Sequence, residues 1–154
     1  MKGVEGGLVD ITRREVDYLK VINKLTESGD YASTHKIARH LNVKEPTVVE
    51  AVRRLSSKGY VVYVPRRGAI LTDKGKALLI NIKRRHRILE TLLVRVLNLD
   101  LEKACDEASK LELYVSDELI DLMCRYLGHP RKCPHGYSIP IKVSCCSVCS
   151  SSSS

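Results

Sequence analysis

The groups in this 154-residue chain best suited to chemistry are a histidine–glutamate pair and a set of cysteines. His86 and Glu90 lie four positions apart, so on a helix the imidazole and the carboxylate share one face. Such a pair can bind a metal, and it can equally form a surface ion pair. Residues 1–10 lack the apolar stretch of a secretion signal, so we expect a cytoplasmic protein whose thiols are free or bind metal. The cysteines are at positions 105, 124, 133, 145, 146 and 149.

The terminal cysteines allow two readings. Cys146 and Cys149 have the spacing of half a zinc knuckle, and Cys133 with His135 could supply the remaining ligands. Residues 141–154, however, are of low complexity and end in five serines, which favours a disordered Cys/Ser-rich tail. Cys124 is most simply read as a small buried hydrophobe.

The elements that must position these groups are mainly helical. Apolar residues recur at helical spacing in most segments, while residues 60–64 and 69–71 flank a Pro-Arg-Arg-Gly turn and predict a β-hairpin. Ser33 is a candidate N-cap, and Pro46 suits the first turn of a helix. The helices are expected at residues 10–25, 33–41, about 45–57, 73–98, 101–113 and 116–127.

Helix, short helix, tight turn, third helix and hairpin form the pattern of a winged helix-turn-helix. In such a domain the third helix enters the major groove and its outward polar residues reach base edges. The start of the second helix and the wing tip can contact phosphates or a minor groove. The residues predicted to contact DNA are Ser33, Thr34, Lys36, Lys44, Thr47, Glu50, Arg53, Arg54, Arg66 and Arg67.

The charge distribution agrees with a polyanion-binding first part. The chain carries a net charge of +8, of which +9 falls in residues 1–100, −4 in residues 101–128 and +3 in the remainder. No apolar run approaches the roughly 20 residues of a bilayer span, so no membrane partner is expected. No phosphate loop, nucleophile–base pair or dinucleotide fingerprint indicates an enzyme or a small-molecule substrate.

A series of motifs, in order and nearly without gaps over residues 11–140, resembles the diphtheria-toxin-repressor and manganese-regulator family of metal-dependent transcription regulators. His86-x3-Glu90 in the long helix and Cys133-Pro134-His135-Gly136 are the most specific of them. The others are Asp17-Tyr18-Leu19, residues 37–43, residues 46–48, residues 71–75, Asp106-Glu107-Ala108 and Ser116-Asp117-Glu118.

The resemblance implies a winged helix-turn-helix at residues 8–75 and a helical metal-binding and dimerisation domain at residues 76–140, followed by the tail at 141–154. It implies a homodimer that binds a palindromic double-stranded DNA operator and represses metal-homeostasis genes. The activating ion would be Fe(II) or Mn(II), with Zn(II) also compatible. It does not specify the operator, the target genes or the physiological metal.

The resemblance also places metal ligands in two neighbouring sites. Asp17 and Glu112 match one site, but Leu113, Ser109 and Lys20 stand where ligands are expected. The other site is better preserved, with His86, Glu90, Cys133, His135 and Cys105 at ligand positions.

The departures at Leu113, Ser109 and Lys20 leave an alternative function open. The chain could be a winged-helix DNA-binding regulator that is independent of metal or responds to thiol oxidation. In that case the cysteine-rich tail would carry the response, and Asp17 and Glu112 would merely pair with nearby basic residues.

Overall fold

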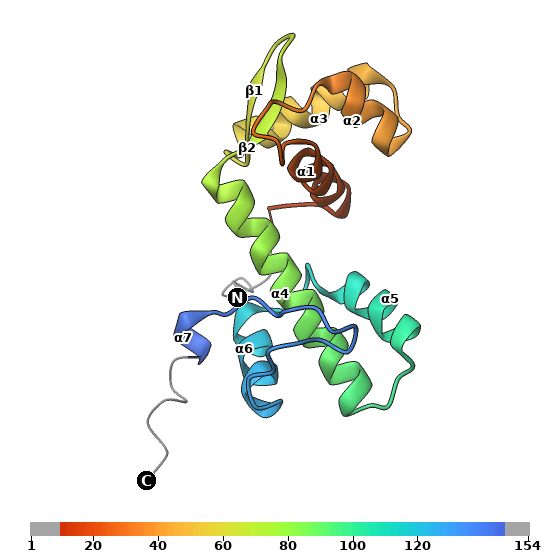
Figure 1. The fold of residues 1–154 in the computed structure, drawn as a ribbon, viewed down its shortest axis with the longest axis vertical. Coiled ribbons are helices and arrows are strands. Elements are labelled where there is room, and N and C mark those ends of the chain that lie inside the picture. Colours follow the sequence, from red (N-terminus) through yellow and green to blue (C-terminus); the bar gives the residue numbers. More distant parts are fainter. Residues whose placement is uncertain (1–9, 147–154) are drawn as a thin grey trace, which may run out of the picture. The chain divides into compact units, whose positions relative to one another are not determined.

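The computed structural model describes residues 10–146, which form two compact units. One unit comprises residues 11–79, and the other contains the described residues from Ile80 onward. The division falls inside the long helix α4 (Asp73–Arg95), which therefore contributes residues to both units (Figure 1). None of the helices between residues 10 and 146 is both long and apolar enough to cross a membrane.

The first unit is a winged helix-turn-helix, as the sequence predicts. Its elements are α1 (Arg13–Leu25), α2 (Thr34–Leu41), α3 (Glu45–Ser57), β1 (Val61–Val64) and β2 (Gly68–Leu71). The two strands pair antiparallel with Val61 opposite Leu71 and Val64 opposite Gly68. One apolar stripe from each helix is buried in the core, for which Leu19, Ile37 and Val52 are fully buried examples.

The ends of these helices follow from their capping residues. Thr12 and Glu15 form a reciprocal capping box, so α1 begins at Arg13 and not at the expected residue 10. The Ser33 hydroxyl accepts from the Lys36 amide and caps α2, as predicted. Gly68 lets the wing lie against the chain before α2, because a Cβ there would be 2.1 Å from the Ala32 carbonyl oxygen.

The second unit is helical and contains the rest of α4, α5 (Leu101–Leu111), α6 (Asp117–Tyr126) and α7 (Val143–Cys146). Ile88, Leu89, Ala108, Ile120 and Ile139 are buried together in its core. Arg85 is fully buried on α4, where it donates to the Glu112 and Val115 carbonyls and to the Asp117 carboxylate. These bonds tie the α5–α6 connection to α4.

Two expectations for this unit are corrected. Helix α4 ends at Arg95 and not near residue 98, because Asn98 adopts a left-handed backbone with φ of 54°. The sequence predicts disorder from residue 141, but residues 143–146 form α7 and Cys145 is buried. Cys145 packs in the core with Ile120 and Cys124, and Lys142 lies 2.6 Å from Asp121, so the segment is held by contacts that its low complexity does not indicate. Cys149 and the terminal serines lie outside the described residues.

Candidate metal centre and nucleic-acid interface

The centre of the second unit is the His86–Glu90 pair on α4. His86 Nε2 lies 3.6 Å from one carboxylate oxygen of Glu90, as the i, i+4 spacing predicts. The Glu90 side chain is 2% exposed and that of His86 is 21% exposed. A carboxylate this well buried needs a compensating positive charge or hydrogen bonds close by.

Helix α5 and Glu112, which follows it directly, supply two further groups around His86. His86 Nδ1 lies 2.8 Å from Glu112 Oε2, and His86 Nε2 lies 3.6 Å from Cys105 Sγ. Burial raises the pKa of the Cys105 thiol, and the negative charges of Glu90, Asp106 and Glu112 raise it further. This thiol therefore keeps its proton unless a cation displaces it.

The loop after α6 brings a second histidine and a second thiol to the other side of Glu90. His135 Nδ1 lies 2.6 Å from Glu90 Oε1, and the buried Cys133 lies close to both residues. The loop is closed on itself, since the Gly136 amide donates to the Cys133 carbonyl and the Cys133 amide donates to the Tyr137 carbonyl. Cys133 and His135 are thus held by backbone hydrogen bonds beside Glu90.

These residues form one cluster around Glu90, which we call the Glu90 centre. The ligand atoms of His86, Glu90 and Cys105 lie within 4.8 Å of one another, and so do those of Glu90, Cys133 and His135. Imidazole and thiolate suit borderline divalent metals such as Fe(II) and Zn(II), and the carboxylate and imidazole groups are also ligands that Mn(II) accepts. The residues present therefore fit the class of ion that the sequence predicts.

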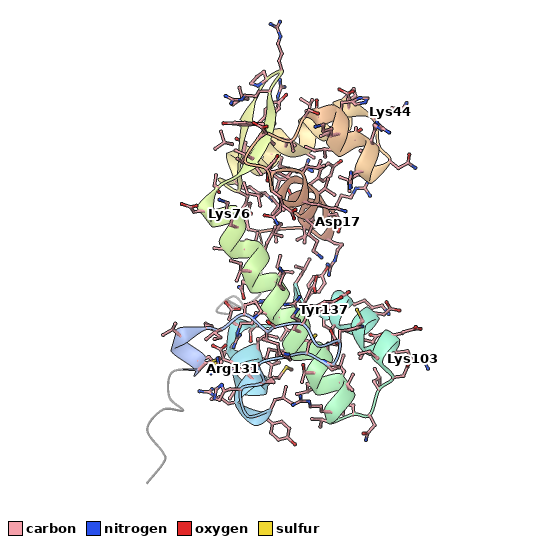
Figure 2. The ribbon with its side chains drawn as sticks, viewed as in Figure 1. Asp17, Lys44, Lys76, Lys103, Arg131 and Tyr137 are labelled. Atoms are coloured by element: carbon pink, nitrogen blue, oxygen red, sulfur yellow. The ribbon has the colours of Figure 1, made fainter. Side chains whose placement is uncertain are left out.

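The structure groups the predicted metal ligands differently from the two sites that the family resemblance implies. Glu112 is expected in a site with Asp17, but it contacts His86. Asp17 is half-buried on α1 of the winged-helix unit (Figure 2), and its role as a ligand stays a prediction. Leu113, which replaces an expected histidine, is buried and apolar. One reading of the sequence places Cys146 beside Cys133 and His135 in a zinc knuckle, but it lies instead with Cys124, His129 and Cys145.

The predicted DNA-contacting residues of α3 lie on its exposed face. Thr47, Glu50, Arg53 and Arg54 are all exposed, and Lys44 is exposed immediately before the helix (Figure 2). This arrangement leaves Thr47 and Arg53 exposed for contact with base edges, as a recognition helix requires, whereas Arg54 lies between Glu15 and Glu50. The contacts themselves remain predictions.

The wing and the start of α2 present the predicted phosphate contacts. Arg66 and Arg67 are exposed in the turn between β1 and β2, and Arg66 has a positive φ of 68°. The Arg67 guanidinium lies over the Tyr31 ring, 4.4 Å from its centroid, which orients this side chain. Ser33 and Thr34 are half-buried and Lys36 is exposed at the start of α2.

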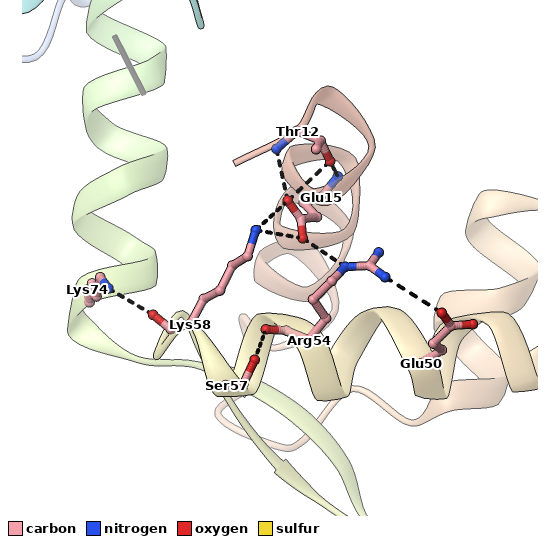
Figure 3. A network of polar contacts seen from close by, with 7 residues as sticks. All are labelled: Thr12, Glu15, Glu50, Arg54, Ser57, Lys58 and Lys74. Carbon is pink, nitrogen blue, oxygen red and sulfur yellow. Dashed lines mark hydrogen bonds and ion pairs between the residues drawn. The ribbon is translucent and has the colours of Figure 1, made fainter. Parts of the chain in front are cut away.

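Glu15 holds two elements of the winged-helix unit together, which the helical periodicity of the sequence does not predict. This buried carboxylate accepts from the Thr12 amide at 2.9 Å, Arg54 Nε at 3.0 Å and Lys58 Nζ at 3.1 Å (Figure 3). Burial alone would raise its pKa, but these bonds outweigh burial and lower the pKa to about 2. Glu15 therefore anchors α3 to the start of α1. The capping-box pattern Thr-x-x-Glu before an apolar run was the signal that could have revealed it.

Comparison with known proteins agrees with both units. The family model described as "Iron dependent repressor, N-terminal DNA binding domain" matches residues 10–69. The model "Iron dependent repressor, metal binding and dimerisation domain" matches residues 72–141. The chain belongs to the iron-dependent repressor family.

Some relatives of this chain are longer than it, and others are of similar length. The diphtheria toxin repressor of Corynebacterium efficiens is 36% identical over 86% of this chain and 56% of its own length. The chain therefore spans little more than half of that relative. A crystal structure of a hypothetical protein from Sulfolobus solfataricus is 34% identical, covers 85% of this chain and 100% of its own, and has a TM-score of 0.80.

The solved structure of a manganese regulator resembles this chain in both sequence and fold. The structure of the manganese regulator SloR is 35% identical, with a TM-score of 0.67 over 85% of this chain and 61% of its own. These comparisons confirm the family and the fold class predicted from the sequence motifs.

Proposed function

We propose that this chain is a metal-dependent, DNA-binding transcriptional regulator that represses metal-homeostasis genes as a homodimer. The observation that carries the proposal is that two groups of potential ligands, each with one histidine and one thiol, share the buried carboxylate of Glu90 in the second unit. A winged helix-turn-helix in the same chain supplies the DNA-binding surface. Relatives named as iron-dependent and diphtheria toxin repressors support a role as a regulator and not as an enzyme.

The metal would be held by His86, Glu90, Cys105, Cys133 and His135, with Glu112 orienting His86. When bound, it would supply the positive charge that the buried carboxylates of Glu90 and Glu112 require. The histidines would then be neutral and the thiols deprotonated. Because protons compete with the metal for these groups, the affinity for metal should fall as the pH is lowered. The thiols of the ligand set favour Fe(II) or Zn(II), and the carboxylate and imidazole groups also suit Mn(II). We infer Fe(II) or Mn(II) as the activating ion from the names of the relatives, with Zn(II) also compatible. Relatives are named as an iron-dependent repressor and a manganese regulator.

Helix α4 could couple metal binding to the DNA-binding unit, because it contributes residues to both units. It carries His86 and Glu90, and its first residues belong to the winged-helix unit. Ligands that close around Glu90 fix the rotamers of His86 and Glu90 and with them the second half of this helix. We infer that metal binding narrows the conformations available to the linked DNA-binding unit.

A homodimer on a palindromic operator follows from the geometry of DNA recognition. One winged helix offers one recognition helix, and specific affinity usually requires two half-sites about a helical turn or a multiple apart. The second unit matches a family model whose description includes dimerisation. Helix α6 supports this function, because Leu119, Leu122 and Tyr126 form an exposed apolar stripe at i, i+3 and i+7.

The experiment that tests the proposal is operator binding under defined metal concentrations. An operator would be selected from random double-stranded DNA with the purified full chain and Mn(II) or Fe(II) under anaerobic conditions. Fluorescence anisotropy should then show tighter binding with Fe(II) or Mn(II) than with chelator, and His86→Ala should remove the difference. The Lys103→Ala variant, altered at an exposed α5 residue, should keep it. An affinity that no metal and no chelator changes would overturn metal dependence.

A further inference from the structure

A second group of metal-binding side chains lies in the same unit and shares no residue with the Glu90 centre. The ligand atoms of Cys124, His129, Cys145 and Cys146 all lie within 4.8 Å of one another. Cys124 Sγ is 3.5 Å from His129 Nδ1. Three thiols and one imidazole at this separation are one of the usual ligand sets of a closed, tetrahedral zinc site. We call this group the Cys124 cluster.

The backbone after α6 is built to place His129 beside Cys124. The Gly128 amide donates to the Arg125 carbonyl at 3.0 Å, and the His129 amide donates to the Cys124 carbonyl at 2.8 Å. With Gly128 at φ of 73°, these two bonds are those of a Schellman motif. His129 itself has a φ of 54°, a conformation that few non-glycine residues adopt. In this conformation the imidazole of His129 lies 3.5 Å from Cys124 Sγ.

Helix α7 brings the other two thiols to the same point. The amides of Cys145 and Cys146 both donate to the Lys142 carbonyl, which forms the single turn of this short helix. Cys145 is buried and Cys146 is half-buried. A core role would explain the two buried thiols of Cys124 and Cys145, but it does not explain why a histidine and a third sulfur lie beside them.

The surroundings of the Cys124 cluster are charged as a thiolate-rich metal site requires. Arg84 is 3% exposed, and its Nη1 lies 3.0 Å from Asp121, which also binds Lys142 at 2.6 Å. This trio carries one net positive charge. A divalent ion with three thiolates and a neutral histidine carries one net negative charge, so the two cancel in the buried interior.

Arg84 also has donors that the thiolates could satisfy. Its Nε and Nη2 are buried and have no hydrogen-bond partner among residues 10–146. Burial alone would lower the pKa of Arg84, but Asp121 and the charged forms of the Cys124, Cys145 and Cys146 thiols raise it. Buried guanidinium donors left without acceptors are costly, whereas metal-bound thiolate sulfurs can accept hydrogen bonds.

We propose that Cys124, His129, Cys145 and Cys146 bind one zinc ion in a structural site that fastens α7 to α6. Binding converts three thiols to thiolates, so each releases a proton to solvent as its sulfur bonds to the zinc, and no electron is transferred. With no open coordination position, the site would stabilise the fold and would not sense metal. It is therefore separate from the regulatory role proposed for the Glu90 centre.

Metal content of single variants tests the site. The full chain would be produced with zinc under reducing conditions and its zinc per chain measured by mass spectrometry. We expect Cys146→Ser and His129→Ala to lose one zinc relative to the unaltered chain, while His86→Ala keeps that zinc. Each variant would be repeated with Cys149→Ala, so that no additional thiol replaces a missing ligand. Equal zinc in Cys146→Ser, His129→Ala and the unaltered chain would overturn the proposal.

Cobalt substitution gives a second readout that does not depend on zinc retention. In a chain with His86→Ala and Glu90→Gln, Co(II) should produce a strong thiolate-to-cobalt charge-transfer band and the visible bands of a tetrahedral ion. Cys146→Ser in that background should weaken the first band, and circular dichroism would establish that the variant is folded. A folded parent chain that shows neither band, or that holds a disulfide among these cysteines after anaerobic purification, would contradict a zinc site.

Discussion

Glu90 and His135 lie 45 positions apart in the chain, yet Glu90 Oε1 is 2.6 Å from His135 Nδ1. The other oxygen of the same carboxylate faces His86 at 3.6 Å. Glu90 thus connects the helix α4 to the loop after α6, and every group of the Glu90 centre is arranged around it. We therefore expect this buried carboxylate to contribute more to metal affinity than any other group of the proposed site.

Glu90→Gln should therefore weaken metal binding while keeping the size of the side chain. The amide cannot supply the negative charge, and its NH2 group cannot accept from either histidine. We expect the dissociation constant for Mn(II) to rise at least about tenfold, which corresponds to roughly 1.4 kcal/mol, measured by competition with a metal indicator. Glu107→Gln removes a carboxylate from exposed α5 surface and is the matched control. Equal affinities for both variants would refute the central role of Glu90.

Glu15→Gln should destabilise the winged-helix unit in a pH-dependent way. The pKa of Glu15 falls from 4.5 to about 2 on folding, so the charged carboxylate stabilises the fold by roughly 3 kcal/mol. A group with a lowered pKa contributes this stability above pH about 4.5 and loses it as the pH falls through about 2. Thermal unfolding followed by circular dichroism should show a gap between the unaltered chain and the variant that closes over this range.

The control for that experiment is Glu50→Gln on α3. Glu50 lies 3.8 Å from the same arginine, Arg54, but its side chain is 79% exposed. An exposed pair contributes little to stability, so its unfolding temperature should stay close to that of the unaltered chain at every pH. A gap for Glu15→Gln that does not change between pH 6 and pH 2 would contradict the ionic anchor.

Part of the fold and of the candidate metal site is predictable from the sequence. The winged helix was predictable because local signals agree: an N-cap at Ser33, a proline in the first turn of α3 and regular apolar spacing. His86 and Glu90 were predictable for the same reason, since helical spacing alone brings them together. The family resemblance then supplied Cys105, Cys133 and His135 as ligands.

The remaining contacts depend on how segments pack, which periodicity does not encode. Glu112 matched a family position beside Asp17, but the end of α5 places it 2.8 Å from His86. The sequence predicts a core position for Cys124 and disorder for the segment that contains Cys145 and Cys146. It therefore does not predict that these cysteines lie together. Only the Schellman turn at Gly128 and the docking of α7 bring Cys124, His129 and Cys145 together.

Arg66→Ala combined with Arg67→Ala should weaken DNA binding without changing sequence preference. Both guanidinium groups are exposed at the wing tip, and contacts to phosphates carry no base information. The slope of log affinity against log salt should become shallower by about 2, one unit for each phosphate contact. Lys103→Ala removes an exposed lysine from α5 of the other unit and should leave the slope unchanged. Thr47→Ala should instead alter which operator variants are preferred.

Leu122→Asp should weaken the homodimer that we propose. Leu119, Leu122 and Tyr126 are 43%, 49% and 73% exposed and line one face of α6, and a carboxylate in the middle of a buried apolar interface lacks a partner. We expect the dimer dissociation constant to rise at least about tenfold in sedimentation equilibrium. Val62→Asp changes a valine that is 45% exposed on β1 of the other unit, so it should leave the dimer intact. If Leu122→Asp dimerises as tightly as Val62→Asp, the α6 stripe is not the interface.

Operator binding that weakens together with dimerisation would show that both half-sites are needed, because an isolated chain presents a single recognition helix.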